Sequence, residues 1–176
     1  MDTLNKGLRK VEAALKWDPS PTGSPPMDLD LVAAVYAVDD PHQHPVYVVH
    51  FDQRAPDGTI TLNRDSRTGQ GFGWDEVLTL ELDRLSSAYG RVVVGVAVQQ
   101  REGTRTFRDV IGPEARLREG YEELGTTDFA AVPDAAAATV AEFVRAADGE
   151  WTYRPLVQGF DTDLTAFTAA MGNKPA

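Results

Sequence analysis

The sequence predicts an all-β protein, an antiparallel β-sandwich of two sheets that ends in one short helix. Many short segments alternate apolar and polar residues with a period of two, which is typical of strands with one buried face. Turn-forming residues separate these segments at short intervals, as in sandwiches of antiparallel strands. The length of 176 residues suits one domain, expected to span 1–176, and 42% apolar residues are enough for a core.

The first half of the chain contains most of the predicted strands. The segments with a strand-like pattern are KVEAALKW at 10–17, MDLDLVAAVYAV at 27–38, PVYVVHF at 45–51, TITL at 59–62 and VLTLEL at 77–82. Side chains alternate between the two faces of a strand. Four apolar residues of the first segment share one face: Val11, Ala13, Leu15 and Trp17. We expect this face to pack into the core.

The next segment, RVVVGVAVQQ at 91–100, is a nearly continuous run of apolar and mostly β-branched residues. Such runs are typical of strands that are buried on both faces. Turn-forming residues interrupt the strand pattern at Pro56-Asp57-Gly58, Tyr89-Gly90 and Asp148-Gly149. We expect the chain to reverse direction at these three positions.

Residues 134–160 combine two competing patterns. The alanines of this segment favour a helix. Asp148-Gly149, however, lies between β-prone segments, and Asp-Gly in that setting is a strong hairpin signal. We prefer a hairpin, with a helical turn around 134–138 left open. The segment TDLTAFTAAMG at 162–172 predicts a short C-terminal helix with Asp161 or Thr162 as its N-cap and Gly172 as its stop.

The composition limits the classes of function. A formal net charge of −10 argues against a nucleic-acid partner, because binding phosphates requires clustered Lys and Arg. The same acidity suits a cation site, although solubility alone also explains it. The absence of cysteine excludes disulfides, thiolate metal sites and cysteine nucleophiles. We find no signal peptide and no run of about 20 apolar residues, and therefore expect a cytoplasmic protein without a membrane span.

The stretch NRDSRTGQGFGWDE at 63–76 contains alternating glycines between acidic residues. A P-loop needs a lysine that this stretch lacks, and a dinucleotide fingerprint needs a different glycine spacing that leads into a helix. Flanking carboxylates would also repel a phosphate. We therefore exclude phosphate binding.

A cation is the better candidate for this loop. Asp65 and Glu76 have the spacing of the first and last ligands of an EF-hand, but the residues between them do not match that motif. Glycines such as Gly69 and Gly71 allow the backbone to turn its carbonyls inward, while Asp65, Asp75 and Glu76 supply charge. A plain hairpin loop with a solvated acidic end is the alternative.

A second acidic segment precedes the apolar part of MDLDLVAAVYAV. Asp28 and Asp30 are two residues apart, so both point to the same side of a strand. Two carboxylates on one face repel each other unless a cation or hydrogen-bond donors neutralise them. Solvated acids at the start of a strand are the alternative. Asp18, at the end of the preceding predicted strand, is a candidate to join this pair.

Several of these segments together resemble the TerD family of tellurium-resistance and stress-response proteins, over about residues 6–172. KWDP followed by MDLDLVA resembles the family's G-W-D and D-L-D-A segments. DGTITLNRDSRTGQGFGWDEVLTLEL is similar to its signature, in which G-D-N-x-T-G-E-G-x-G-D-D-E lies between two strands. TFRDVIGPEARL and VAEFVRAADGEWTYRPLVQGF resemble the two later family segments in the same order.

The resemblance implies a calcium-binding β-sandwich without enzymatic activity that acts in stress response or signalling with other proteins of a stress-response complex. It implies a site with Asp28 and Asp30 on one side and the loop on the other. The implied loop ligands are Asp65, Ser66 at the family's Asn position, Asp75, Glu76 and the carbonyls around Gly69 and Gly71. It also favours the hairpin at 134–160.

The loop departs from the family pattern, because the family commonly has six acidic residues where this loop keeps Asp65, Asp75 and Glu76. Family members are described as holding two ions, and calcium affinity follows ligand charge and number. We therefore expect one calcium site rather than two. One alternative is a metal-independent interaction scaffold that uses Phe72 and Trp74. Another is a metal-dependent hydrolase with Asp75 or Glu76 as its base.

Overall fold

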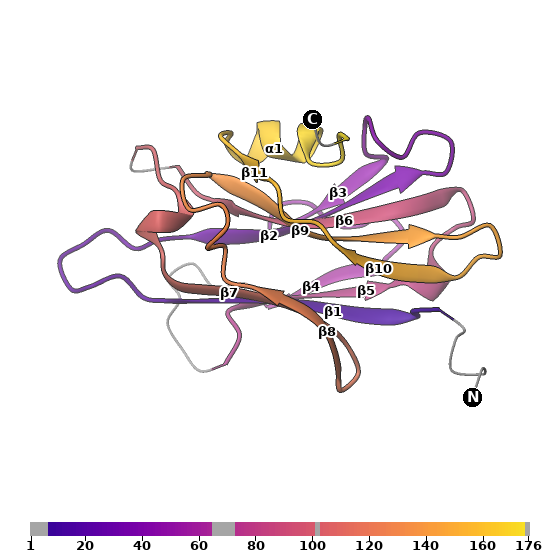
Figure 1. Cartoon of the computed structure of the whole chain (residues 1–176), viewed down its shortest axis with the longest axis horizontal. Helices are drawn as coiled ribbons and strands as arrows, with labels where there is room; N and C mark the ends of the chain where they lie inside the picture. Colours follow the sequence, from indigo (N-terminus) through magenta and orange to yellow (C-terminus); the bar gives the residue numbers. More distant parts are fainter. Residues whose placement is uncertain (1–6, 65–72, 101–102, 175–176) are drawn as a thin grey trace.

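Two antiparallel sheets stack face to face in the protein, which confirms the predicted all-β sandwich (Figure 1). A computed structural model describes residues 7–64, 73–100 and 103–174. The first sheet, called sheet A here, has five strands in the order β4-β5-β1-β7-β8. Its strands are β1 (Lys10–Asp18), β4 (Ile60–Arg64), β5 (Glu76–Glu81), β7 (Ile111–Glu119) and β8 (Glu122–Thr127).

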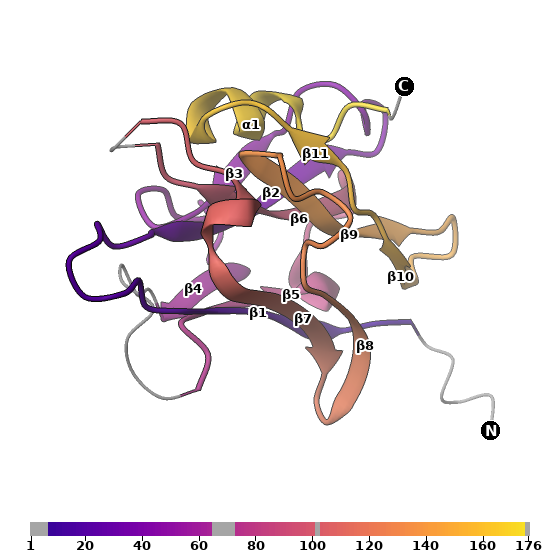
Figure 2. The same ribbon diagram turned by 60° about the vertical axis from the view of Figure 1, so that its left-hand side comes forward.

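The second sheet, called sheet B, follows the order β10-β9-β6-β2-β3, and β11 also pairs with β9. Its strands are β2 (Leu29–Ala37), β3 (Tyr47–Val49), β6 (Tyr89–Val98), β9 (Ala137–Arg145), β10 (Trp151–Pro155) and β11 (Gly159–Phe160). The 3-10 turns η2 (Leu82–Arg84) and η3 (Phe107–Asp109) connect strands, and the helix α1 (Leu164–Ala170) follows β11. Figure 2 shows α1 on the side of sheet B that faces away from sheet A.

The main core lies between the two sheets. The predicted inward face of β1 is buried, since Val11 and Leu15 are fully inaccessible and Trp17 is 2% exposed. Leu29 and Leu31 of β2 pack into the same core from sheet B, together with alternate residues of β5. The period-two pattern thus predicted the inward-facing residues of β1 correctly, because successive side chains of a strand point to opposite faces of the sheet.

A second, smaller core covers the outer face of sheet B. Val93 and Ala97 of β6 pack there with Phe167 of α1 and Met171. This explains why β6 is apolar on both faces, as its sequence predicted. Gly95 is required at the contact, because a Cβ at this position would lie 2.6 Å from the Phe167 ring.

The hairpin at 134–160 is confirmed: β9 and β10 pair around a turn that contains Asp148 and Gly149. The sequence left a helical turn at 134–138 open. In the structure, β9 begins at Ala137 and pairs with β6, so the end of this segment is extended. Pairing with a neighbouring strand outweighs the helix propensity of alanine here.

Two details of the prediction are wrong. Tyr89 and Gly90 do not form a turn but begin β6, and the turn lies just before them. Gly90 fits there because a Cβ would come within 3.2 Å of the Val38 backbone. The N-cap of α1 is Asp163, whose Oδ1 accepts a hydrogen bond from the Ala166 N–H at 3.0 Å. Pairing of β11 with β9 keeps the chain extended to Phe160, so the helix starts later than expected.

Across the part of the chain that the structure describes, no helix combines the length and the apolar character needed to cross a bilayer.

Candidate metal centre

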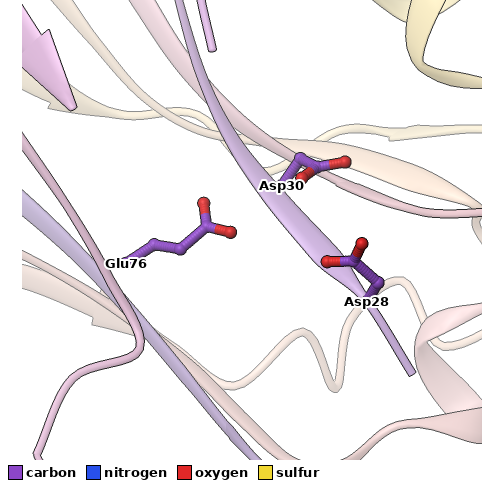
Figure 3. A group of neighbouring side chains, drawn as sticks. All are labelled: Asp28, Asp30 and Glu76. Atoms are coloured by element: carbon purple, nitrogen blue, oxygen red, sulfur yellow. The ribbon is translucent and has the colours of Figure 1, made fainter. Parts of the chain in front are cut away.

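Three carboxylates from two different sheets meet at one end of the sandwich. Asp28 directly precedes β2, Asp30 lies within β2, and Glu76 is the first residue of β5 (Figure 3). One carboxylate oxygen of each lies within 4.8 Å of the others. The side chains are almost inaccessible to water, at 9% exposure for Asp28, 2% for Asp30 and 1% for Glu76. We call Asp28, Asp30 and Glu76 the acidic triad.

The local structure of β2 explains why Glu76 can reach this strand. The edge strand β3 pairs with β2 only over Ala33–Val35, so Leu31 lies beyond that pairing. Glu76 extends from sheet A, and its Oε1 accepts a hydrogen bond from the Leu31 N–H at 2.8 Å. The carboxylate thus takes the place of a neighbouring strand at the open edge of β2, and the bond is charge-assisted.

Gln99, which follows β6, contacts both aspartates of the triad. Its side-chain Nε2 donates a hydrogen bond to Asp30 Oδ2. Its backbone N–H donates to the Asp28 carbonyl at 2.8 Å, which continues the pairing of β2 with β6. Sequence reasoning missed Gln99, because nothing in the dipeptide Gln99-Gln100 distinguishes it from an ordinary polar strand end.

Asp75 is buried beside the triad but has a different partner. It is 2% exposed, and its Oδ2 accepts a hydrogen bond from the Trp17 N–H at 2.9 Å. Its own N–H donates to the Leu15 carbonyl at 2.8 Å, next to the pairing of β1 with β5. Asp75 is not a member of the triad, and the sequence did not predict this separation from Glu76.

The other predicted ligands divide into two groups. Asp65, Ser66, Gly69 and Gly71 lie outside the described residues, as does Phe72 of the alternative interaction surface. Asp18, which we considered as a further ligand, is exposed and lies against Gly112 instead. The register of β1 shifts between Lys16 and Asp18, where Asp18 pairs with Ile111. Asp18 is therefore directed to β7 and away from the triad.

Trp74 is half-buried on the approach to β5. Lys16 Nζ lies 4.9 Å from its ring centroid, and the Arg116 guanidinium lies 4.3 Å from it. Cations at this range are attracted to the face of an indole ring. Trp74 thus contacts two cationic side chains, one from β1 and one from β7.

The donor set of the triad fits a hard divalent cation. All of its side-chain ligands are carboxylate oxygens, the type that calcium prefers. Like charges in a low-dielectric setting repel each other strongly, so a cation that binds between these carboxylates would relieve that repulsion. The residues present therefore fit the calcium ion that the family resemblance implies.

The fold and the acidic triad define this chain as a two-sheet β-sandwich with a buried, oxygen-rich candidate cation site. A family model described as the TerD domain matches residues 1–170, and the chain belongs to the TerD family. It is 27% identical over 169 residues to the tellurium resistance protein TerD of Serratia marcescens, covering 94% of this chain and 88% of that protein.

Two solved structures are similar over almost the whole chain. One is the crystal structure of SAV2460, a protein of unknown function, with 58% identity and a TM-score of 0.94, covering 97% of this chain and 100% of that one. The other, from Streptomyces coelicolor A3(2), is described as a homologue of telluride resistance protein (TerD). It has 54% identity and a TM-score of 0.93, covering 96% of this chain and 100% of that one.

Proposed function

We propose that this protein is a calcium-binding module of the TerD family that acts in stress response or signalling without catalytic activity. The observation that carries the proposal is the acidic triad, whose three buried carboxylates come from two sheets. Asp28, Asp30 and Glu76 would supply charged oxygen ligands. Asp65, Ser66 and the carbonyls of Gly69 and Gly71 are proposed to complete the shell, and Asp75 adds negative charge beside it.

Calcium is preferred over magnesium because of the ligand set. Calcium accepts six to eight oxygen ligands in flexible geometry, whereas magnesium demands a near-octahedral shell and keeps several waters. The triad offers three carboxylates, whereas magnesium is usually held by one or two. Among the residues that the structure describes, the acidic triad is one such group of carboxylates, and we propose one calcium ion rather than two.

The proposed role is binding rather than redox chemistry. The chain has no cysteine, so it has no thiol with which to reduce tellurite itself. Relatives are named for tellurium resistance. We propose that this protein contributes to such a response in the cytoplasm through other proteins, with calcium occupancy as the signal.

A calcium titration of chelator-treated protein tests the proposal. We expect saturable heat of binding in calorimetry and a rise in melting temperature. At a free calcium concentration of 100 Kd, binding stabilises the folded state by about 2.7 kcal/mol. For a chain of this size, that corresponds to a shift of roughly 5–11 °C. Magnesium at the same concentration should produce a smaller shift.

The double variant Asp28→Asn/Asp30→Asn is the matched control, because it keeps the shape of both side chains and removes their charge. It should lose the calcium-dependent shift in melting temperature. If the wild-type protein shows neither binding heat nor a shift at millimolar calcium, the proposal is wrong.

A further inference from the structure

Trp17 forms hydrogen bonds to the residue before Glu76 and to the residue before Asp28. It lies in β1 and is 2% exposed. Its backbone N–H donates to Asp75 Oδ2 at 2.9 Å, and Asp75 immediately precedes Glu76. Its indole Nε1–H donates to the Met27 carbonyl at 3.0 Å, and Met27 immediately precedes Asp28. One residue is thus hydrogen-bonded next to two members of the triad.

The indole hydrogen bond connects the two sheets. Trp17 belongs to sheet A, whereas Met27 leads into β2 of sheet B. Both partners are buried, so removing the donor would leave the Met27 carbonyl without this bond in a poorly hydrated place. The bond therefore restrains the start of β2, and with it Asp28, relative to the strand that carries Glu76.

We infer that Trp17 is a positioning residue for the calcium site, an inference that rests on the proposed function. Calcium requires its oxygen ligands at about 2.3–2.6 Å, so a small displacement of one carboxylate weakens binding. Groups that orient metal ligands typically contribute about 10–100-fold to metal affinity. The indole N–H acts in this way through the Met27 carbonyl, without touching the ion itself.

Trp151 provides a matched control for the size and burial of the indole. It lies in β10 and is also 2% exposed. Its Nε1 has no hydrogen-bond partner among the described residues, and the Arg145 guanidinium lies 4.6 Å from its ring. Replacing either tryptophan by phenylalanine removes similar buried surface, but only Trp17→Phe removes a hydrogen bond beside the triad.

The test compares calcium affinity by calorimetry with unfolding free energy in chelator for the wild type, Trp17→Phe and Trp151→Phe. We expect both variants to lose stability and only Trp17→Phe to bind calcium about tenfold more weakly. If the wild type binds calcium and Trp17→Phe binds as tightly, or if both variants weaken equally, the inference is wrong. A wild type that binds no calcium overturns the proposed function first, and this inference with it.

A second measurement uses the wild-type protein and covers the case in which Trp17→Phe does not fold. In ¹H–¹⁵N NMR spectra, the Trp17 indole resonance should shift with the same midpoint as calcium binding, and its hydrogen exchange should slow. The Trp151 indole resonance should stay in place. A Trp17 indole signal that is unchanged at saturating calcium contradicts the inference.

Discussion

Glu76 is the residue that joins two separate acidic segments into one site. Asp28 and Asp30 belong to the start of β2, whereas Glu76 reaches them from β5 in the other sheet. Its Oε1 is held by the Leu31 N–H, which fixes the carboxylate beside β2. Because three buried acids at this distance repel each other, their charge favours cation binding and opposes folding without a cation.

Glu76→Gln should therefore separate cation binding from stability. The amide oxygen can still accept the Leu31 hydrogen bond, but one of the three charges is gone. We expect calcium affinity to fall at least about tenfold, while the unfolding free energy in chelator does not decrease. Calorimetry and urea denaturation measure the two quantities.

The control for this variant is Glu122→Gln, which makes the same chemical change at an exposed position at the start of β8. It should leave calcium affinity unchanged. Calcium binding by Glu76→Gln that is as tight as in the wild type would show that Glu76 is not a ligand.

At the scale of elements, the turn before β4 leads the chain into the strand that precedes the glycine-rich loop. Asp57 Oδ1 accepts a hydrogen bond from Thr59 Oγ1 at 2.7 Å and another from the Thr59 N–H at 3.1 Å. Partial burial of Asp57 raises its pKa, but these hydrogen bonds outweigh that effect and lower the pKa below its ordinary value of 3.8. The ionised carboxylate therefore stabilises this turn.

Asp57→Asn should lower the unfolding free energy at neutral pH, because the hydrogen bonds to Thr59 are no longer charge-assisted. The decrease should be less than about 1 kcal/mol, because the turn is open to solvent. A lowered pKa in the folded state gives stability that is present above the ordinary value and lost as the pH falls through the folded value. The difference between wild type and variant should therefore shrink as the pH falls below 3.8.

Denaturation at pH 7 and pH 3 measures this difference. Asp161→Asn, at an exposed position, is the control and should match the wild type at both pH values. If the difference in unfolding free energy between the wild type and Asp57→Asn is the same at both pH values, the charge of Asp57 does not stabilise the turn.

At the scale of the whole molecule, both sheets share one core, and the candidate site lies where polar contacts join them. Residues of β1, β2, β5, β6 and β9 all contribute to the cluster between the sheets. Glu76 and Trp17 each reach from sheet A to sheet B. Neither sheet can separate without disrupting both the core and the triad, so we expect the molecule to unfold as a unit.

Urea unfolding followed by far-UV and near-UV circular dichroism should therefore give coincident transitions in chelator. Calcium should raise the midpoint of both signals equally without changing the slope m, because binding stabilises the folded state and leaves the surface exposed on unfolding almost unchanged. Two separate transitions, or a calcium-dependent shift in only one signal, would indicate that the site orders a local segment alone.

The sequence determined the fold class because strands with one apolar face need a second layer to cover it. Alternation identified the inward face of β1 and the shared side of Asp28 and Asp30, and a continuous apolar run identified the doubly buried β6. The errors arose where long-range pairing outweighs local propensity. Tyr89-Gly90 extends β6 because β2 pairs with it. The helix α1 begins at Leu164, with Asp163 as its N-cap, because β11 keeps the preceding chain extended.

Only the tertiary structure determined which of the acidic side chains lie together in one candidate site. Asp75 and Glu76 are adjacent in the sequence, but they have different partners. Glu76, the first residue of β5, reaches β2, whereas Asp75, just before the strand, bonds to Trp17. Gln99 and Trp17 contact the site only because distant strands are neighbours in space. The sequence by itself specified which carboxylates were available, and the packing of two sheets decided which of them share one site.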